Sequence, residues 1–178
     1  MKTLRNLSVI TVLFTFFIAF TSFKQPKKEK VNWITLEELK EAYAKNPKPV
    51  IFDVYTSWCG WCRVMDRETY SQETVANYIN DNYYAVKFNA ETKDSVEFAG
   101  KKFGYNPSFK ANELAVYLLN GNMGYPSTIL LASINAQPAP LPGFLKPSEL
   151  EPPLRFIGDG VYKAKQFPEF MKDFTAKW

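Results

Sequence analysis

The sequence predicts an α/β fold, in which strands alternate with helices along a chain of 178 residues. The prediction depends on residues 50–55, 83–88 and 128–132, which read as strands and are separated by helical patterns. Each of these segments is rich in the apolar, β-branched and aromatic residues that strands prefer. We therefore expect one sheet with helices packed against it.

The chain begins with the pattern of a secretory signal, residues 1–23. Lys2 and Arg5 precede an apolar run at residues 9–20, and small residues follow it. A run of this length is short for a membrane span, which needs about 20 apolar residues. We therefore expect export to the periplasm.

An N-terminal anchor that stays uncleaved is the alternative to a signal peptide. Phe23 is a poor cleavage residue, and several lysines follow it immediately. In either case we expect residues 24–32 to form a solvated linker and residues 33–178 to form the folded domain.

The domain is expected to open with a helix. Thr35 and Glu38 have the spacing of a capping box, and the helix should run to about Ala44. Residues 50–55 follow as an almost continuous apolar run, which is typical of a strand buried on both faces. Asp53 is the one charged residue in that strand.

The chain's only two cysteines come directly after this strand, in the segment Trp58-Cys59-Gly60-Trp61-Cys62. Good helix formers follow Cys62, so Cys59 should lie at or just before a helix N-terminus. Such a pair is a redox motif, half of a zinc site or a structural disulfide. Zinc sites draw on further cysteine and histidine ligands, which this chain lacks. A disulfide that closes so short a loop adds little stability. The pattern therefore favours redox chemistry.

Beyond the cysteines, Ser71 is expected to cap a helix that carries Val75, Tyr78 and Ile79 on one side. A long stretch at residues 91–124 separates the second strand from the third, and it contains a predicted short helix at residues 113–119.

The C-terminal part is predicted from its prolines and its last amphipathic segment. Residues 136–153 are rich in proline, and we expect a turn at Pro142-Gly143. Residues 167–178 have the pattern of a closing amphipathic helix.

These features together resemble the thioredoxin family, and specifically the exported thioredoxin-like thiol-disulfide proteins of bacteria. The resemblance covers roughly residues 33–150 and is strongest in the segment from Trp58 to Cys62. Asp53 falls where the family has a buried aspartate, Lys87 where it has the lysine that pairs with it, and Tyr125-Pro126 looks like its cis-proline loop. The resemblance implies a thioredoxin-like fold, a central mixed β-sheet flanked by helices, with an insertion before the cis-proline loop.

The sequence departs from the family pattern in three places. Trp61 replaces the proline that is usual inside the thioredoxin motif. The stretch at residues 91–124 is longer than the core fold needs, and the part after Leu150 has no clear counterpart.

The catalytic roles follow from thiol chemistry. A thiolate attacks disulfides, and a helix N-terminus lowers the pKa of a cysteine. Cys59 is therefore the predicted nucleophile, exposed and acidic, and Cys62 is the sheltered cysteine that resolves the mixed disulfide. Asp53, paired with Lys87, is the candidate acceptor for the Cys62 proton, directly or through a water. In the alternative interpretation, Asp53 is a strand-end acid in solvent and Lys87 is a surface lysine.

Substrate contacts are assigned to Trp58, Gly60, Trp61, Tyr125 and Pro126. A cis bond at Pro126 would leave the Tyr125 backbone free to pair with an extended substrate strand, whereas the alternative is an ordinary turn. The two tryptophans are expected to flank the sulfurs as an apolar patch. Alternatively one of the two tryptophans packs into the core, and Trp58 is then the better candidate than Trp61.

The sequence therefore predicts an exported protein-disulfide oxidoreductase, most simply a reductase of protein disulfides that receives electrons from a membrane-bound donor. Strong oxidants of the superfamily that this chain resembles carry a histidine within the cysteine motif, whereas this chain contains no histidine. An oxidase or isomerase, and a thioredoxin-fold module that binds peptides without turnover, are the alternatives.

Charge and motif content restrict the partners further. The net charge of +4 falls to +2 when residues 1–23, with two basic residues and no acid, are removed. So small a charge argues against a nucleic-acid partner. The sequence contains no phosphate loop and no metal cluster, so we expect the protein to need no metal and no organic cofactor. We also expect a monomer.

Overall fold

A computed structural model describes residues 30–178. The predicted signal or anchor and most of the linker therefore lie outside the described residues. None of the helices among residues 30–178 has both the length and the apolar character of a membrane-spanning helix.

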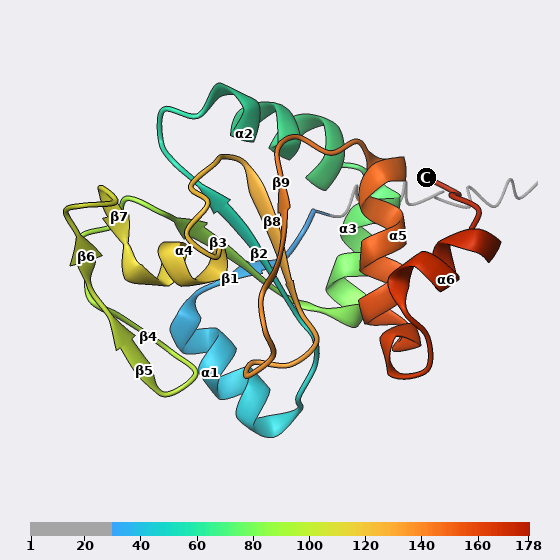
Figure 1. Cartoon of the computed structure of the whole chain (residues 1–178), viewed down its shortest axis with the longest axis horizontal. Helices are drawn as coiled ribbons and strands as arrows, with labels where there is room; N and C mark the ends of the chain where they lie inside the picture. The colour runs from blue at the N-terminus through green and yellow to red at the C-terminus, as the bar shows by residue number, and fades with distance from the viewer. Residues whose placement is uncertain (1–29) are drawn as a thin grey trace, which may run out of the picture.

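The described chain is built on one five-stranded mixed sheet (Figure 1). The strand order is β1 (Trp33–Ile34), β3 (Tyr84–Asn89), β2 (Val50–Tyr55), β8 (Ser127–Leu131) and β9 (Ala139–Pro142). The first three strands are parallel, whereas β8 and β9 run antiparallel to their neighbours. The predicted α/β class and mixed sheet are confirmed, and the second and third predicted strands are each displaced by one residue.

Helices cover both faces of this sheet, as Figure 1 shows. One face carries α1 (Leu36–Lys45) and α4 (Glu113–Leu118). The other face carries α2 (Gly60–Met65), which continues as the π-helical turn η1 (Asp66–Tyr70), together with α3 (Glu73–Asn82) and α5 (Pro147–Gly158). A 3₁₀ turn, η2 (Val161–Lys163), and α6 (Phe167–Asp173) complete the chain.

Strand β2 lies at the centre of the sheet and places Asp53. Val50, Phe52 and Val54 pack into the core under α1 and α4, and Ile51 packs into the core under α2, α3 and α5. Because successive side chains of a strand point to opposite faces, Asp53 shares the face of Ile51. It therefore lies on the side of the sheet that carries the cysteines.

The predicted capping box opens α1. The Thr35 hydroxyl accepts a hydrogen bond from the Glu38 N–H at 3.1 Å, and a Glu38 carboxylate oxygen accepts one from the Thr35 N–H at 2.7 Å. This satisfies two of the N–H groups that a helix start leaves unpaired.

The predicted role of Ser71 as a helix cap is wrong. Gln72 is the N-cap of α3, and the Ser71 hydroxyl instead donates to the Arg67 carbonyl in η1. The reason is that the helical backbone continues through Ser71, so its side chain bonds back to the preceding turn.

The proline-rich segment contains a strand and the first part of a helix, and the sequence predicted neither of them. Pro140 and Pro142 lie in β9, at the edge of the sheet, where strand prolines are tolerated. The turn predicted at Pro142-Gly143 begins at the last residue of this strand, with Gly143 at φ 85°.

Helix α5 forms despite two internal prolines, Pro152 and Pro153. Its buried side chains Leu150 and Leu154 pack under the sheet, and this burial outweighs the hydrogen bonds that the prolines remove. The closing helix α6 ends at Asp173, so the predicted helix to residue 178 is too long.

The insertion at residues 91–124 is a folded structure. It comprises two short hairpins, β4 (Val96–Phe98) with β5 (Lys101–Phe103) and β6 (Tyr105–Asn106) with β7 (Ala111–Asn112), followed by the predicted helix α4.

The fully buried Asn112 fixes this insertion to the end of β3. Its side-chain oxygen caps α4 through the Leu114 N–H, and its amide donates to the carbonyls of Thr92 and Asp94. Its backbone N–H donates to the Ala90 carbonyl at 2.7 Å.

Candidate functional site

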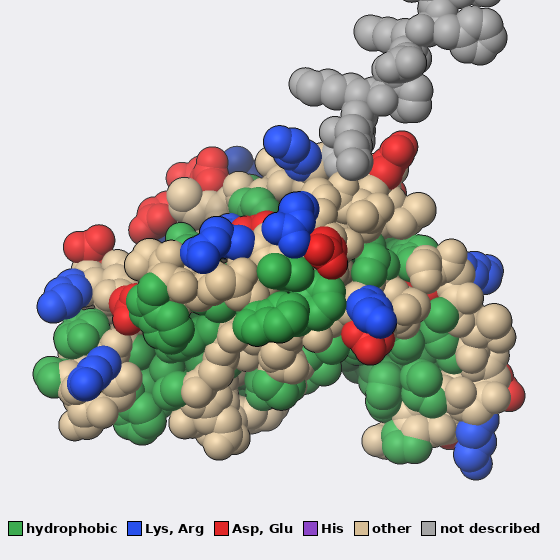
Figure 2. Space-filling view, turned by 90° about the horizontal axis from the view of Figure 1, so that it is seen from above, with side chains coloured by type: hydrophobic (Ala, Val, Ile, Leu, Met, Phe, Trp, Pro, Cys, Tyr) green, Lys and Arg blue, Asp and Glu red, His purple; other side chains and the backbone are tan. Residues whose placement is uncertain are grey.

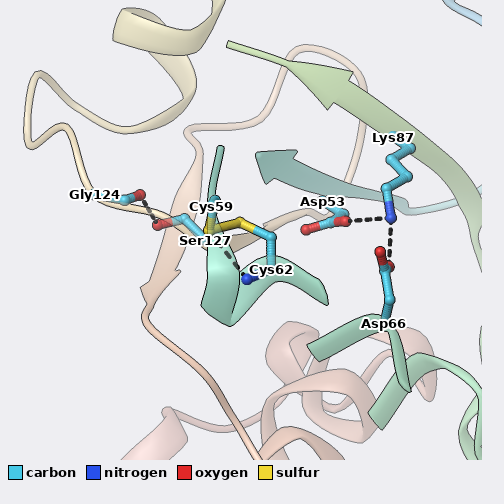
Figure 3. Close-up of a disulfide and its surroundings, with 7 residues drawn as sticks. All are labelled: Asp53, Cys59, Cys62, Asp66, Lys87, Gly124 and Ser127. Carbon is cyan, nitrogen blue, oxygen red and sulfur yellow. Dashed lines mark hydrogen bonds and ion pairs between the residues drawn. A yellow bond between two sulfur atoms is a disulfide. The ribbon is translucent and has the colours of Figure 1, made fainter. Parts of the chain in front are cut away.

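Cys59 and Cys62 form a disulfide at the start of α2 (Figure 3). Cys59 is the N-cap of the helix, and its sulfur accepts a hydrogen bond from the Cys62 N–H at 3.0 Å. The helix start predicted at the cysteines is therefore confirmed. In the reduced protein the same N–H and the helix dipole would stabilise a thiolate on Cys59.

The expected contrast in exposure between the two cysteines is wrong for the disulfide form. Cys59 is 4% exposed and Cys62 is 3% exposed. In the disulfide form both cysteines are therefore buried. The difference between them lies in position, because Cys59 precedes the helix and Cys62 is in its first turn.

Asp53 lies on the inner side of the disulfide, where Figure 3 shows its carboxylate between Cys62 and Lys87. Asp53 is 1% exposed, and Lys87 occupies the paired position on the neighbouring strand β3. The Lys87 Nζ lies 3.2 Å from an Asp53 oxygen. The predicted pairing of the two residues is confirmed, and the alternatives of an exposed acid and a surface lysine are wrong.

The Asp53 carboxyl has no aligned hydrogen-bond donor among the described residues, because the Lys87 contact is close but poorly directed. Burial is the main cause that raises the pKa of Asp53 to about 6, and it acts against the Lys87 charge, which lowers that pKa. Burial alone would lower the pKa of Lys87, but its acidic neighbours reverse this and raise it. A carboxyl with a pKa near neutrality is suited to exchange protons with a thiol.

Asp66 is a site residue that the sequence analysis missed. It begins η1, and its carboxylate accepts a hydrogen bond from Lys87, whose ammonium also contacts Asp53. Asp66 follows Cys62 by four residues, so both lie on one side of the helix, and this spacing was the available signal.

The bond between Tyr125 and Pro126 is cis, as expected. Two hydrogen bonds hold the loop beside β8: the Ser127 hydroxyl donates to the Gly124 carbonyl, and the Gly143 N–H donates to the Pro126 carbonyl, both at 2.8 Å. Figure 3 draws Gly124 and Ser127 in the surroundings of the disulfide.

An aromatic rim surrounds the cysteines, formed by Trp58, Trp61, Tyr125 and Phe144. Trp58 contacts Tyr125 edge to face, with ring centroids 6.1 Å apart, and Trp61 lies 5.8 Å from Phe144. The two tryptophans are 66% and 62% exposed, so the alternative of a tryptophan in the core is wrong. In Figure 2, which views the molecule from the α2 side, hydrophobic side chains gather among scattered charges.

Glu91 and Phe144 are two further residues of the site that the sequence did not predict. The Trp58 indole N–H donates to the Glu91 carboxylate at 3.0 Å, so the first residue of the insertion fixes one side of the rim. Each of them contacts a tryptophan that is distant in sequence, so no local sequence pattern identifies it as part of the site.

Among residues 30–178, no group of three or more histidine, cysteine, aspartate or glutamate side chains is placed to hold a metal ion. The two carboxylates that Figure 3 draws in the surroundings of the disulfide, Asp53 and Asp66, both contact the Lys87 ammonium.

Comparison with known families gives a match over most of the chain. The family model described as "Thioredox_DsbH: Protein of unknown function, DUF255" matches residues 20–141. Solved thioredoxin folds also superpose on about three quarters of the chain. A DsbH oxidoreductase covers 76% of this chain and 90% of its own, with a TM-score of 0.53 at 13% identity. A Thermus thermophilus thioredoxin covers 74% and 88%, with a TM-score of 0.51 at 17% identity. The predicted thioredoxin-like fold is confirmed.

Curated relatives match over shorter segments. An uncharacterized Caenorhabditis elegans protein, B0495.5, is 30% identical over 95 residues, which is 52% of this chain and 11% of the relative. The thiol:disulfide interchange protein DsbD of Pectobacterium atrosepticum is 36% identical over 45 residues, 25% of this chain and 8% of the relative. The chain thus spans about a tenth of the length of these relatives.

Proposed function

Because the chain belongs to the Thioredox_DsbH family, we propose that it is an exported thiol-disulfide oxidoreductase that reduces disulfides of other proteins. The observation that carries this proposal is the Cys59–Cys62 disulfide at the N-terminus of α2. A buried carboxyl behind the pair and a cis-proline loop support it further.

The proposed reaction passes two electrons from the reduced cysteine pair to the substrate. The Cys59 thiolate attacks one sulfur of a substrate disulfide, so a bond between Cys59 and the substrate forms, and the other substrate sulfur leaves as a thiolate that takes up a proton. Cys62 then gives its proton to Asp53. The Cys62 thiolate attacks the Cys59 sulfur, the second substrate thiolate leaves, and the Cys59–Cys62 disulfide closes.

The substrate is proposed to be an extended protein segment beside the cis-proline loop. Within the described part of the chain, the backbone N–H and C=O of Tyr125 make no hydrogen bond, so they are available to a strand from a partner. Trp58, Trp61 and Gly60 would line the apolar contact around the sulfurs, since exposed tryptophans of this size mark interaction surfaces.

The partners and the direction of electron flow belong to the proposal as well. The DsbD relative is named a thiol:disulfide interchange protein, which supports protein thiols as partners. We place the reaction in the periplasm, with a membrane-bound electron donor and a monomeric protein that uses no cofactor besides its own sulfurs. The motif contains no histidine, a feature that favours the reductase over an oxidase.

Equilibration of the protein with glutathione buffers tests the direction. The reductase proposal predicts a midpoint potential of about −270 mV, as in thioredoxin. A midpoint of about −120 mV, as in a strong oxidant, would contradict it.

Trapping tests the exchange chemistry itself. A reduced Cys62→Ala variant should accumulate mixed disulfides when it is incubated with a disulfide-bonded protein such as insulin, because Cys59 attacks one substrate sulfur, the other leaves as a thiolate, and no second cysteine releases the product. The double variant Cys59→Ala, Cys62→Ala is the matched control and should trap nothing. Peptide binding that is equal in both variants, without a trapped species, would instead indicate a binding module.

A further inference from the structure

The Lys87 ammonium lies between two carboxylates that differ in exposure. Its Nζ is 3.2 Å from Asp53 and donates a hydrogen bond to Asp66. The Asp53 side chain is 1% exposed, the Lys87 side chain 25% and the Asp66 side chain 40%. The contacts thus lead from Asp53, in the interior behind the disulfide, through Lys87 to the more exposed Asp66 (Figure 3).

Two aromatic rings flank the ammonium of Lys87. The rings of Trp33 and Tyr55 lie with their centroids 5.6 and 5.3 Å from Nζ, so cation–π contacts hold it from the sides. An ammonium held in this way can redistribute between its two carboxylates without leaving the site.

The remaining groups that face Asp53 do not compete for its proton. Tyr70, from η1, shares a hydrogen bond of 2.8 Å with Thr128, which is paired with Asp53 on β8. Burial raises the pKa of Tyr70 well above its usual value, so Tyr70 stays neutral while Asp53 titrates. From α2, the facing group is Cys62.

A buried ammonium without a counter-ion is costly. If Asp53 were the only partner of Lys87, protonation of Asp53 would leave the ammonium unpaired, and Asp53 would resist accepting a proton. Asp66 removes this obstacle, because Lys87 keeps a carboxylate partner when Asp53 becomes neutral. The proximity of the Asp66 charge itself also raises the pKa of Asp53.

We propose that Asp66 is a positioning residue that acts through Lys87 to make Asp53 a stronger base for the Cys62 proton. The inference rests on the proposed function, since Cys62 gives up its proton only in the exchange reaction. In that step the proton leaves the Cys62 sulfur for an Asp53 oxygen, and Lys87 pairs with Asp66. When Asp53 later releases the proton to water, Lys87 is again shared by both carboxylates.

Titration of Asp53 in the disulfide form tests the inference without any need for activity. The carboxyl ¹³C resonance of Asp53 is followed with pH by NMR in the wild-type protein and in an Asp66→Asn variant. Glu68→Gln is the matched control, because Glu68 lies in the same helical turn but pairs with Arg67. We expect the midpoint of Asp53 to move to lower pH in D66N and to stay in place in E68Q. An unchanged or raised midpoint in D66N would overturn the inference.

A second measurement separates the route through Lys87 from direct repulsion between the two carboxylates. In a Lys87→Met background, D66N should lose most of its effect on the Asp53 midpoint. An equal effect in both backgrounds would show that Asp66 acts on Asp53 directly, and the assigned role would be wrong.

The pH profile of disulfide reduction links the inference to turnover. A weaker base should slow the step, so the plateau rate of D66N falls roughly threefold while the acid limb of the profile moves to lower pH. A lower plateau with an unmoved limb would indicate mere structural damage and would contradict the inference. A wild-type protein that reduces no disulfide would refute the proposed function, whereas the NMR titration would still report on Asp53 and Asp66.

Discussion

Asp53, the proposed acceptor of the Cys62 proton, lowers the stability of the fold at neutral pH. It is the only charged side chain in β2 and is 1% exposed at the centre of the sheet. Burial raises its pKa to about 6, so the folded protein binds the Asp53 proton more tightly than the unfolded chain does. Stability is therefore greatest while Asp53 is protonated, and it falls as the pH rises from about 4 through about 6.

An Asp53→Asn variant should consequently be more stable than the wild type at neutral pH. The raised pKa of Asp53 corresponds to a gain of about 2–3 kcal/mol in the free energy of unfolding of the variant at pH 8. The cost of burying the asparagine amide reduces this gain. The advantage should vanish as the pH falls toward about 4. Urea unfolding at several pH values measures this difference in stability, and Asp81→Asn, at an exposed position, is the control. An advantage that does not depend on pH would contradict this account of Asp53.

At the scale of the element, local signals decide which parts of the fold are predictable. The capping box of α1 and the apolar run of β2 are each complete within a few residues, and both were predicted correctly. Helix α5 carries prolines that argue against a helix, and only its burial under the sheet makes it stable. Tertiary packing of this kind leaves no local pattern in the sequence.

Helix α5 also holds the C-terminus through Glu151. This fully buried carboxylate binds the Arg155 guanidinium at 2.7 Å and accepts hydrogen bonds from the backbone N–H groups of Lys177 and Trp178. Trp178 in turn packs against Tyr78 of α3, with ring centroids 5.5 Å apart. One carboxylate thereby links α5, the last residues of the chain and α3.

A Glu151→Gln variant should lower the free energy of unfolding by roughly 3 kcal/mol, because its amide NH₂ must face either Arg155 or the two backbone donors and leaves that side without an acceptor. Hydrogen exchange of the Lys177 and Trp178 amides should accelerate, while thiol exchange stays unchanged. Glu169→Gln, an exposed position in α6, is the control and should alter neither quantity. Unchanged amide protection in E151Q would show that Glu151 does not hold the C-terminus.

At the scale of the whole molecule, the sequence predicted the parts of the site that adjoin the cysteines. The disulfide at a helix start, the buried Asp53 and the cis bond before Pro126 each depend on a short segment. The contacts that complete the site join distant segments: Lys87 reaches Asp66 across 21 residues, and Trp58 reaches Glu91 across 33. Such contacts depend on how strands and helices are brought together, which no single segment encodes.

The central claim is that the start of α2 makes Cys59 the attacking sulfur. Alkylation of the reduced protein with iodoacetamide, followed by peptide mass mapping over a range of pH, measures this most directly. The account predicts that Cys59 is labelled first, with an apparent pKa below the value of about 8.5 for an ordinary cysteine. Labelling of Cys62 first, or equal labelling of both cysteines with ordinary pKa values, would contradict it.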